Sequence, residues 1–238
     1  MNKMNKPWLS HYDPGIPAEI TIPDISLVNL LQNAVSSFGT SICTIYGEET
    51  LTYEDIDDLS DRIARYLSSV GLEKGDRVGI LLPNTPAFVI SYYGILKAGG
   101  VVMALSPGYR PSEIQSLAEE SGVRVLILAD AVYTEVKAIQ DHTMIKHFVV
   151  VGGEMMPLED SDLAWDLLLE NFDSEASIDV VVGPDDPAVF QYSGGTTGTP
   201  KCAIGLHRNL VANVYQFDQW LINTEIGQET VLVAIPVY

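Results

Sequence analysis

The sequence predicts an α/β fold in which a doubly wound, mostly parallel sheet carries helices on both faces. Short apolar runs typical of buried strands alternate with helical patterns between residues 77 and 151. Strands that alternate with helices build right-handed βαβ units, and such units form parallel sheets covered on both faces. Hydrophobic residues make up 47% of the 238 residues and charged residues 19%, which indicates an ordered globular chain with a substantial core.

The segment ahead of this alternation predicts a surface leader, two helices and a strand. Residues 1–24 are rich in proline and turn-forming residues. Apolar residues recur at helical spacing from Leu27, and a short strand is expected over Ile42–Tyr46. Thr52 is placed to cap a second helix, which Gly71 ends.

The alternating segment itself predicts strands joined by helices of ordinary length. The predicted strands are Val78–Leu82, Val101–Leu105, Arg124–Leu128 and Phe148–Val151. The predicted helices are one that begins at Pro86 after an N-cap at Thr85, then Pro111–Ser121 and Tyr133–Gln140.

A strongly acidic stretch follows. Between Lys146 and Lys201 the chain has eleven Asp and Glu residues and no Lys or Arg. An acidic interaction face is one interpretation. A solvated surface over one amphipathic helix is the simpler one, with the apolar side chains beneath it being Leu163, Leu167 and Leu168.

The last third of the chain predicts two strands around a loop, then a helix and a further strand. The strands flanking the loop are Val189–Tyr192 and Lys201–Ile204. Ligands of doubly wound sheets lie beyond the carboxyl ends of the strands, so the loop is expected in that position. The following helix carries Leu210, Val214, Phe217 and Leu221 on one face, and its amino end around His207–Asn209 is expected to point near the bound anion. A strand is expected over Val231–Pro236.

The loop, residues 192–201, has a composition suited to a chain of phosphates. Three glycines, three threonines and one serine occupy ten positions that end at Lys201. Exposed backbone N–H groups in such turns form anion-binding concavities, and hydroxyls add donors. The residues around Lys201 do not fit a Walker A loop, and no Gly-x-Gly occurs here as in a dinucleotide-binding fingerprint. Composition alone leaves a flexible polar surface loop as an equal alternative.

Charge, cysteine content and hydropathy argue against several classes of protein. A net charge of −19 argues against nucleic-acid binding. Cys43 and Cys202 show no paired spacing and are interpreted as reduced thiols of a cytoplasmic protein. No apolar run approaches the roughly 18 residues of a membrane-spanning helix, and the first residues lack the apolar core of a secretory signal. The four histidines show no metal-binding spacing, so no metal ligand is assigned.

Four motifs in order resemble the adenylate-forming (AMP-binding) superfamily, which includes acyl-CoA synthetases, luciferases and peptide-synthetase adenylation domains. Residues 193–201 resemble its phosphate-binding loop. Leu51–Asp55 and Leu96–Val102 resemble its first and second core motifs. Gly205–Leu210 resembles the segment after the loop in long-chain fatty acyl-CoA synthetases. Cys202 departs from the pattern, which usually has glycine after the lysine.

The resemblance implies an enzyme that activates a carboxylic acid with ATP and Mg²⁺, forms an acyl-adenylate and pyrophosphate, and passes the acyl group to CoA. Pro236 and Tyr238 would lie at the start of the segment that lines the acyl pocket. The β- and γ-phosphates of ATP would be held by Ser193, Gly194, Gly195, Thr196, Thr197, Gly198, Thr199 and Lys201. Small molecules are thus the expected partners.

The same resemblance covers nearly all of this chain but only about the first two fifths of a typical member, so roughly 350 further residues are expected. No catalytic residue is therefore assigned, and the chain alone is predicted to be inactive. Residues 1–75 and 226–238 would be parts of an incomplete second lobe, and residues 76–225 most of a first lobe with the phosphate loop. The incomplete lobe should expose apolar surface that favours homo-oligomers.

Two other hypotheses stay open at this point. The chain could belong to a sister branch that activates amino or aryl acids. It could also be a stand-alone protein that binds phosphates or a partner without catalysis. Peripheral membrane association is compatible with a fatty-acid enzyme, although no residue pattern indicates it.

Overall fold

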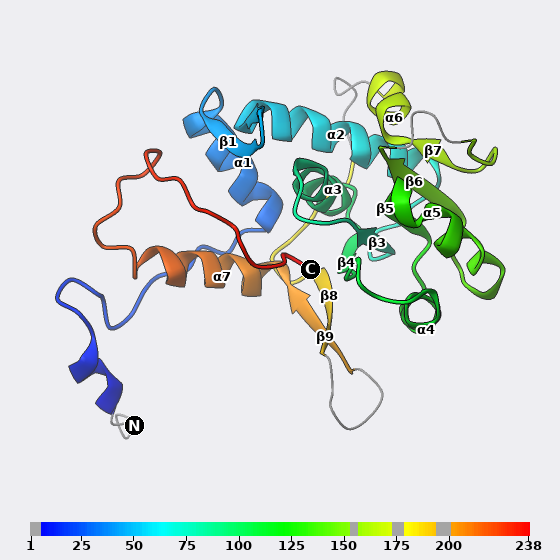
Figure 1. Ribbon diagram of the computed structural model, residues 1–238. Coiled ribbons are helices and arrows are strands. Elements are labelled where there is room, and N and C mark those ends of the chain that lie inside the picture. Colours follow the sequence, from blue (N-terminus) through cyan, green and yellow to red (C-terminus); the bar gives the residue numbers. More distant parts are fainter. Residues whose placement is uncertain (1–5, 153–156, 173–178, 194–200) are drawn as a thin grey trace.

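The computed structural model describes residues 6–152, 157–172, 179–193 and 201–238, and is built around a seven-stranded sheet (Figure 1). The strand order is β7-β6-β5-β3-β4-β8-β9, and only the β8–β9 pair is antiparallel. A separate hairpin pairs the first two strands. The strands are β1 (Ile42–Tyr46), β2 (Glu49–Thr52), β3 (Arg77–Leu81), β4 (Val101–Ala104), β5 (Val125–Ala129), β6 (His147–Val151), β7 (Leu163–Ala164), β8 (Pro187–Ser193) and β9 (Lys201–Leu206).

Helices cover both faces of this sheet, as the sequence predicts. Alternate residues of one strand point to opposite faces: Ile80 packs in the cluster with α1, α2, α3, α6 and α7, while Leu81 packs in the cluster with α4 and α5. The helices are α1 (Leu27–Phe38), α2 (Tyr53–Ser69), α3 (Pro86–Lys97), α4 (Pro111–Ser121), α5 (Asp130–Lys137), α6 (Trp165–Asn171) and α7 (His207–Asp218), with 3₁₀ turns at Pro7–His11 and Gln140–His142.

The contact between α2 and α3 is close. A Cβ atom on Gly94 would lie 2.5 Å from Cβ of Ile63, so the absence of a side chain lets the two helices approach. Lys97 is 7% exposed and reaches across the same contact. Its Nζ lies 2.6 Å from Oδ1 of Asp57 and 2.7 Å from Oδ1 of Asp61. The helices are thus joined by an apolar contact and a nearly buried ion cluster.

Several predicted boundaries are confirmed. Thr52 caps α2: its Oγ1 accepts the Asp55 N–H at 3.1 Å, and Oδ2 of Asp55 accepts the Thr52 N–H at 2.8 Å. Pro86 begins α3 and Pro111 begins α4. The strand β2 was missed, because the turn at Gly47 (φ 62°) immediately returns the chain into an antiparallel hairpin.

Two helix predictions need correction. The helix expected over Tyr133–Gln140 begins earlier, at Asp130, directly after β5. The helix expected over Leu163–Leu168 is wrong at its start, because Leu163 belongs to β7 and pairs with β6. In α6 the buried positions are Trp165 and Leu168, three residues apart, so Leu167 faces outward and is 51% exposed.

The strand expected over Val231–Pro236 is also wrong. A strand needs a neighbouring strand for its backbone hydrogen bonds, and this segment has none within the described part of the chain; it is irregular. The expected exposure of apolar surface is confirmed: Val231, Leu232 and Ile235 are 72%, 88% and 75% exposed. The division into lobes at residues 75 and 225 stays a prediction.

Candidate functional site

The predicted phosphate loop joins β8 to β9 at the carboxyl edge of the sheet. β8 runs parallel to β4, and β4 runs parallel to β3, so these three strands end at the same edge. Ser193 at the end of β8 pairs with Lys201 at the start of β9, and this pair closes the base of the loop (Figure 1). Open α/β sheets bind their ligands at this edge. The backbone therefore places the loop where a ligand would be expected.

Six of the eight predicted phosphate-binding residues lie outside the described residues, namely Gly194, Gly195, Thr196, Thr197, Gly198 and Thr199. The other two flank the loop. Ser193 is the last residue of β8, and Lys201 is the exposed first residue of β9. The roles of all eight stay predictions.

The amino end of α7 does not lie near the loop, so that expectation is wrong. Because β9 runs antiparallel to β8, Leu206 pairs with Pro187 at the beginning of β8. The start of α7 therefore lies about 17 Å along β9 from Lys201 at the base of the loop, since five strand residues rise about 3.3 Å each. The amide groups of His207 and Arg208 donate to backbone carbonyls of the segment before β8. They are therefore already used within the protein.

Tyr192 and Cys202 form the pair next to the base of the loop. Burial raises the pKa of the Tyr192 hydroxyl to about 12, and Cys202 and Glu120 add to the shift. Burial also raises the pKa of the Cys202 thiol. Both groups are therefore protonated at neutral pH. Cys202 is half-buried, so this position accommodates a side chain where the resemblance suggested glycine.

The backbones of β8 and β9 approach closely at Gly205, three residues after Cys202. A Cβ atom on Gly205 would lie 2.7 Å from Cγ1 of Val189. The glycine therefore lets β8 and β9 pair without a side chain between them. In the sequence Gly205 is recognisable only as part of the motif after the loop, because its packing role depends on the pairing with Val189.

A buried histidine at the start of α7 was also missed. His207 is 1% exposed, and its Nδ1 accepts the Leu27 N–H at 3.1 Å, which joins α7 to α1. Burial lowers the pKa of His207 to about 4, although Asp186 opposes the shift. Asp186 pairs with Lys74 at 2.7 Å. No local pattern predicts a contact between residues 180 positions apart, so only the fold reveals it.

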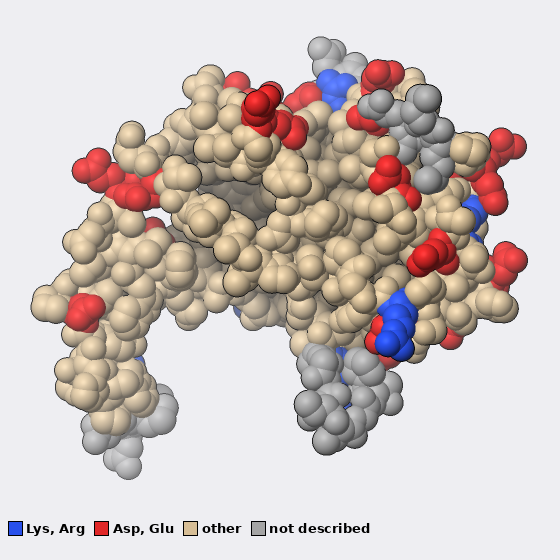
Figure 2. Space-filling view, viewed as in Figure 1, with Lys and Arg blue, Asp and Glu red and all other residues tan. Residues whose placement is uncertain are grey.

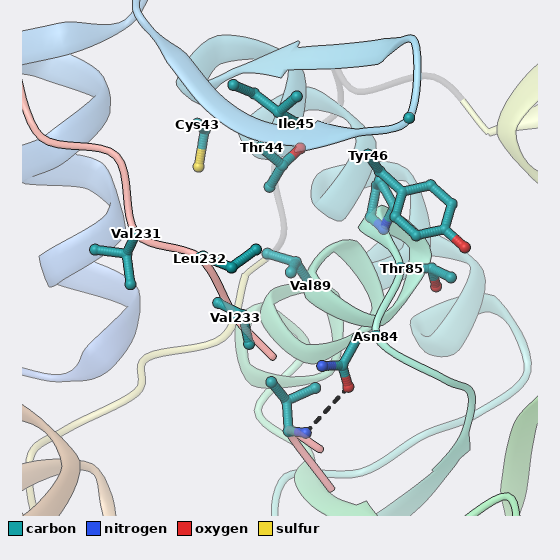
Figure 3. Close-up of a pocket in the computed structure, with 13 residues that line it drawn as sticks. Cys43, Thr44, Ile45, Tyr46, Asn84, Thr85, Val89, Val231, Leu232 and Val233 are labelled. Carbon is teal, nitrogen blue, oxygen red and sulfur yellow. Dashed lines mark hydrogen bonds between the residues drawn. The ribbon is translucent and has the colours of Figure 1, made fainter. Parts of the chain in front are cut away.

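A cavity of about 370 Å³ opens between the β1–β2 hairpin, the start of α3 and residues 231–237. Figure 2 shows the surface hollowed in this region, without Lys, Arg, Asp or Glu at its centre. In the close-up, Cys43 and Thr44 point down from the hairpin, and Val89 of α3 points toward Leu232 (Figure 3). The lining residues are Cys43, Thr44, Ile45, Tyr46, Gly47, Asn84, Thr85, Pro86, Val89, Val231, Leu232, Val233 and Val237.

Asn84 fixes one wall of this cavity. Its Nδ2 donates to the carbonyl oxygen of Ile235 at 2.7 Å. Its Oδ1 accepts the Val237 N–H at 3.1 Å, the hydrogen bond drawn as a dashed line in Figure 3. The side chain thereby satisfies two backbone groups that have no partner strand. The predicted acyl-pocket residues lie in the same segment, but Pro236 is exposed and Tyr238 packs against the main core. Neither lines the cavity.

Among the described residues, no three His, Cys, Asp or Glu side chains are grouped so as to hold a metal ion. The helices of the described segments are all too short or too polar to cross a bilayer. The assignment of no metal ligand stays a prediction.

Residues 31–238 match the family of AMP-binding enzymes, so the chain belongs to this family. It is 30% identical over 256 residues to a long-chain-fatty-acid–CoA ligase of Bacillus subtilis, with 98% of this chain and 46% of the relative covered. It is 33% identical over 207 residues to 4-coumarate–CoA ligase 3 of rice (Oryza sativa subsp. japonica), with 82% of this chain and 35% of the relative covered. The chain thus spans about half, or less, of the length of these relatives.

The fold is also found in solved structures. A long-chain-fatty-acid–CoA ligase of Archaeoglobus fulgidus superposes with a TM-score of 0.74 and 25% identity, over 87% of this chain and 41% of that chain. An anthranilate–CoA ligase bound to anthranoyl-AMP gives the same TM-score at 21% identity, over 82% of this chain and 38% of that chain. The mostly parallel sheet covered by helices is therefore the architecture of this family's amino-terminal region.

Proposed function

We propose that this chain carries the phosphate-binding part of an acyl-CoA synthetase, which joins a fatty acid to AMP and then to CoA. The observation that carries the proposal is the position of the 193–201 loop at the carboxyl edge of the parallel sheet. Membership of the AMP-binding family and the 30% identity to a long-chain-fatty-acid–CoA ligase support it. The chain covers less than half of that relative, so the complete reaction belongs to this proposal.

The chemical problem is negative charge. A carboxylate attacks the α-phosphate of ATP, the acyl-adenylate forms, and pyrophosphate leaves with additional charge. Hydrogen-bond donors and cations that are already oriented stabilise such charge most effectively. In this proposal residues 194–199 supply backbone N–H donors for the β- and γ-phosphates, Thr196 and Thr197 add hydroxyl donors, and Lys201 supplies a positive charge.

The exposed position of Lys201 at the base of the loop fits this assignment. The overall charge of −19 repels ATP, but salt screens that field over about 8–10 Å, so local donors dominate at contact. Mg²⁺ supplies charge neutralisation when it accompanies ATP. We assign no residue to Mg²⁺ or to CoA. The free state of Cys43 and Cys202 supports a reducing, cytoplasmic location, peripheral to the membrane where the fatty acid is supplied.

Pyrophosphate binding tests the loop directly. Lys201→Ala should weaken pyrophosphate binding roughly tenfold or more, because a charge-assisted contact contributes about 1.5–3 kcal/mol. Calorimetric titration of the unmodified chain and of Lys201→Ala with pyrophosphate, at fixed ionic strength, measures the two dissociation constants. Lys6→Ala is the matched control, since Lys6 lies in the leader and pairs with Glu19. Equal pyrophosphate affinity in Lys201→Ala and the unmodified chain would mean that the loop assignment is wrong.

The chain alone is proposed to form no adenylate. ATP–pyrophosphate exchange with fatty and aryl acids tests this statement, and measurable exchange contradicts it. The exposed apolar residues of the carboxyl-terminal segment also support self-association of the isolated chain. Sedimentation at several concentrations distinguishes a monomer from an oligomer.

An aryl-acid ligase is the second candidate. The 33% identity to a rice 4-coumarate–CoA ligase favours it, although that match covers only 35% of the relative. A complete protein that activates 4-coumarate faster than any fatty acid would establish this alternative. A protein that binds pyrophosphate but activates no acid would support a non-catalytic phosphate-binding role.

A further inference from the structure

We propose that Asn84 is a positioning residue of the proposed site: its side-chain amide takes the place of a neighbouring strand and holds residues 235–237 at the carboxyl edge of the sheet. The inference rests on the proposed function, because the predicted pocket residues Pro236 and Tyr238 lie in or directly after the segment that Asn84 holds. The role concerns the path of the backbone and is independent of what the adjacent cavity binds.

The two hydrogen bonds of Asn84 reproduce those of a parallel strand. Nδ2 donates to the carbonyl oxygen of Ile235 at 2.7 Å, and Oδ1 accepts the Val237 N–H at 3.1 Å. The two bonded residues flank Pro236, just as one peptide of a parallel strand bonds the residues on either side of the residue opposite it. Pro236 has no N–H, and in this arrangement none is needed on the side that faces Asn84. One side chain therefore satisfies backbone groups that a neighbouring strand would otherwise satisfy.

The backbone of Asn84 is itself held by the sheet. Asn84 is the third residue after β3, and Thr85 and Pro86 begin α3 directly after it. Leu82, two residues before Asn84, is 1% exposed. A buried strand and the first turn of a helix thus fix the amide from both sides. Only β4 separates β3 from β8, so the carboxyl ends of β3 and β8 lie about 10 Å apart. Asn84 therefore holds its segment close to the strand that leads into the phosphate loop.

Burial contributes little to the path of this segment. Ile235 and Val237 are 75% and 43% exposed. Within the described part of the chain no strand pairs with residues 231–237, and Tyr238 packs against the main core only at the end of the segment. Regions with few buried contacts open locally without global unfolding. Loss of the two Asn84 bonds should therefore release the segment and leave the sheet intact.

Hydrogen exchange of the Val237 amide tests this role in the 238-residue chain. Asn84→Leu keeps a side chain of similar size but has no donor and no acceptor. The Val237 amide should exchange roughly tenfold faster in this variant, as expected when two hydrogen bonds between neutral groups are lost. Amides of β3 and β8 should keep their rates. Water-exchange NMR measures the rates of individual amides. Thr85→Val is the matched control, because Thr85 also lines the cavity but its Oγ1 donates to the carbonyl oxygen of Pro83.

Asn84→Asp provides a readout that general loosening of the fold would not move. A carboxylate accepts the Val237 N–H but cannot donate to Ile235, whereas a protonated carboxyl group does both. The ordered segment favours the protonated form, so it raises the pKa of the introduced carboxyl group, and the restraint is present at low pH and lost as pH rises. None of the residues that line the cavity beside Asn84 is Asp, Glu, His, Lys or Arg. Relative to the unmodified chain at the same pH, Val237 should exchange several-fold faster at about pH 7.5, and this ratio should fall toward one near about pH 4.5.

The outcomes separate the role of Asn84 from the proposed function. Faster Val237 exchange in Asn84→Leu, no change in Thr85→Val and a pH-dependent ratio in Asn84→Asp support the proposal. An unchanged Val237 rate in Asn84→Leu, equal acceleration of the β8 amides, or an Asn84→Asp ratio that stays constant with pH overturns it.

Pyrophosphate titration of the same proteins reports on the phosphate loop. No pyrophosphate binding to the unmodified chain rejects the phosphate site, while the Val237 rates still decide whether Asn84 holds the segment. Pyrophosphate binding together with unchanged Val237 rates rejects only the role of Asn84.

Discussion

The strand β6 and the carboxyl-terminal segment are both strongly apolar but differ completely in burial. Phe148 and Val149 of β6 are fully buried, whereas Leu232 and Ile235 are 88% and 75% exposed. β6 has a strand on each side and helices on both faces. Residues 231–237 are tied to the fold by two hydrogen bonds of the Asn84 side chain and line an open cavity with α3 and the β1–β2 hairpin. Apolar sequence therefore produces burial only where a second layer is available to cover it.

The largest expected effect contrasts a core leucine with a tail leucine. Leu67 is fully buried in α2, so Leu67→Ala should lower the free energy of unfolding by about 3–4 kcal/mol. Leu232→Ala removes the same atoms from a side chain that is 88% exposed, and should change stability by less than about 0.5 kcal/mol. Urea unfolding followed by circular dichroism measures the free energy of unfolding of both variants. Similar losses in the two variants would mean that the tail is as well packed as the core.

A smaller effect is expected at the ion cluster between α2 and α3. Lys97→Met should cost about 2–4 kcal/mol, because Asp57 and Asp61 would lose the nearly buried ammonium group that they share. Burial already raises the pKa of Asp61, and Lys97 opposes that shift. Lys6→Met breaks an exposed pair and should cost less than about 1 kcal/mol. Equal unfolding midpoints for the two variants would contradict this difference.

The smallest effect depends on pH and concerns the join between α1 and α7. The folded-state pKa of His207 is about 4, below its ordinary value of 6.5, so the unfolded chain binds the proton first as pH falls. The stabilisation is complete above pH 6.5 and is lost between about 6.5 and 4, by about 2–3 kcal/mol.

His207→Asn separates this effect from the many carboxylates of the chain. Asn offers an oxygen near the position of Nδ1 but does not titrate, so the difference in unfolding free energy between the two proteins should narrow as pH falls from 7 to 4. Urea titrations at several pH values measure that difference. A gap that stays constant with pH would show that His207 titrates normally and is not held neutral by burial.

Local signals account for most of the correct predictions. Thr52, Pro86 and Pro111 marked helix starts, because caps and proline act within one turn of the chain. Short apolar runs marked β3 to β6, because strands buried on both faces leave no polar alternation. The loop was found from composition and residue order, and its place at the carboxyl edge followed from the parallel topology.

The wrong predictions concern features that depend on neighbours. Leu163 lies in a strand because it pairs with β6. Val231–Pro236 forms no strand because no strand in the described part of the chain lies beside it. The start of α7 was misplaced because β9 runs antiparallel, a direction that its residues alone do not specify. The Asn84 contacts were missed because they join residues about 150 positions apart.

The sequence by itself determined the alternation of strands and helices, the family and the place of the candidate phosphate loop in the chain, because each is encoded in residues adjacent along the chain. The tertiary structure decided which strand ends meet, that His207 is buried against α1, and that Asn84 holds residues 235–237 over a cavity. These contacts arise only when distant segments pack together, and their free energies depend on burial that no local pattern contains.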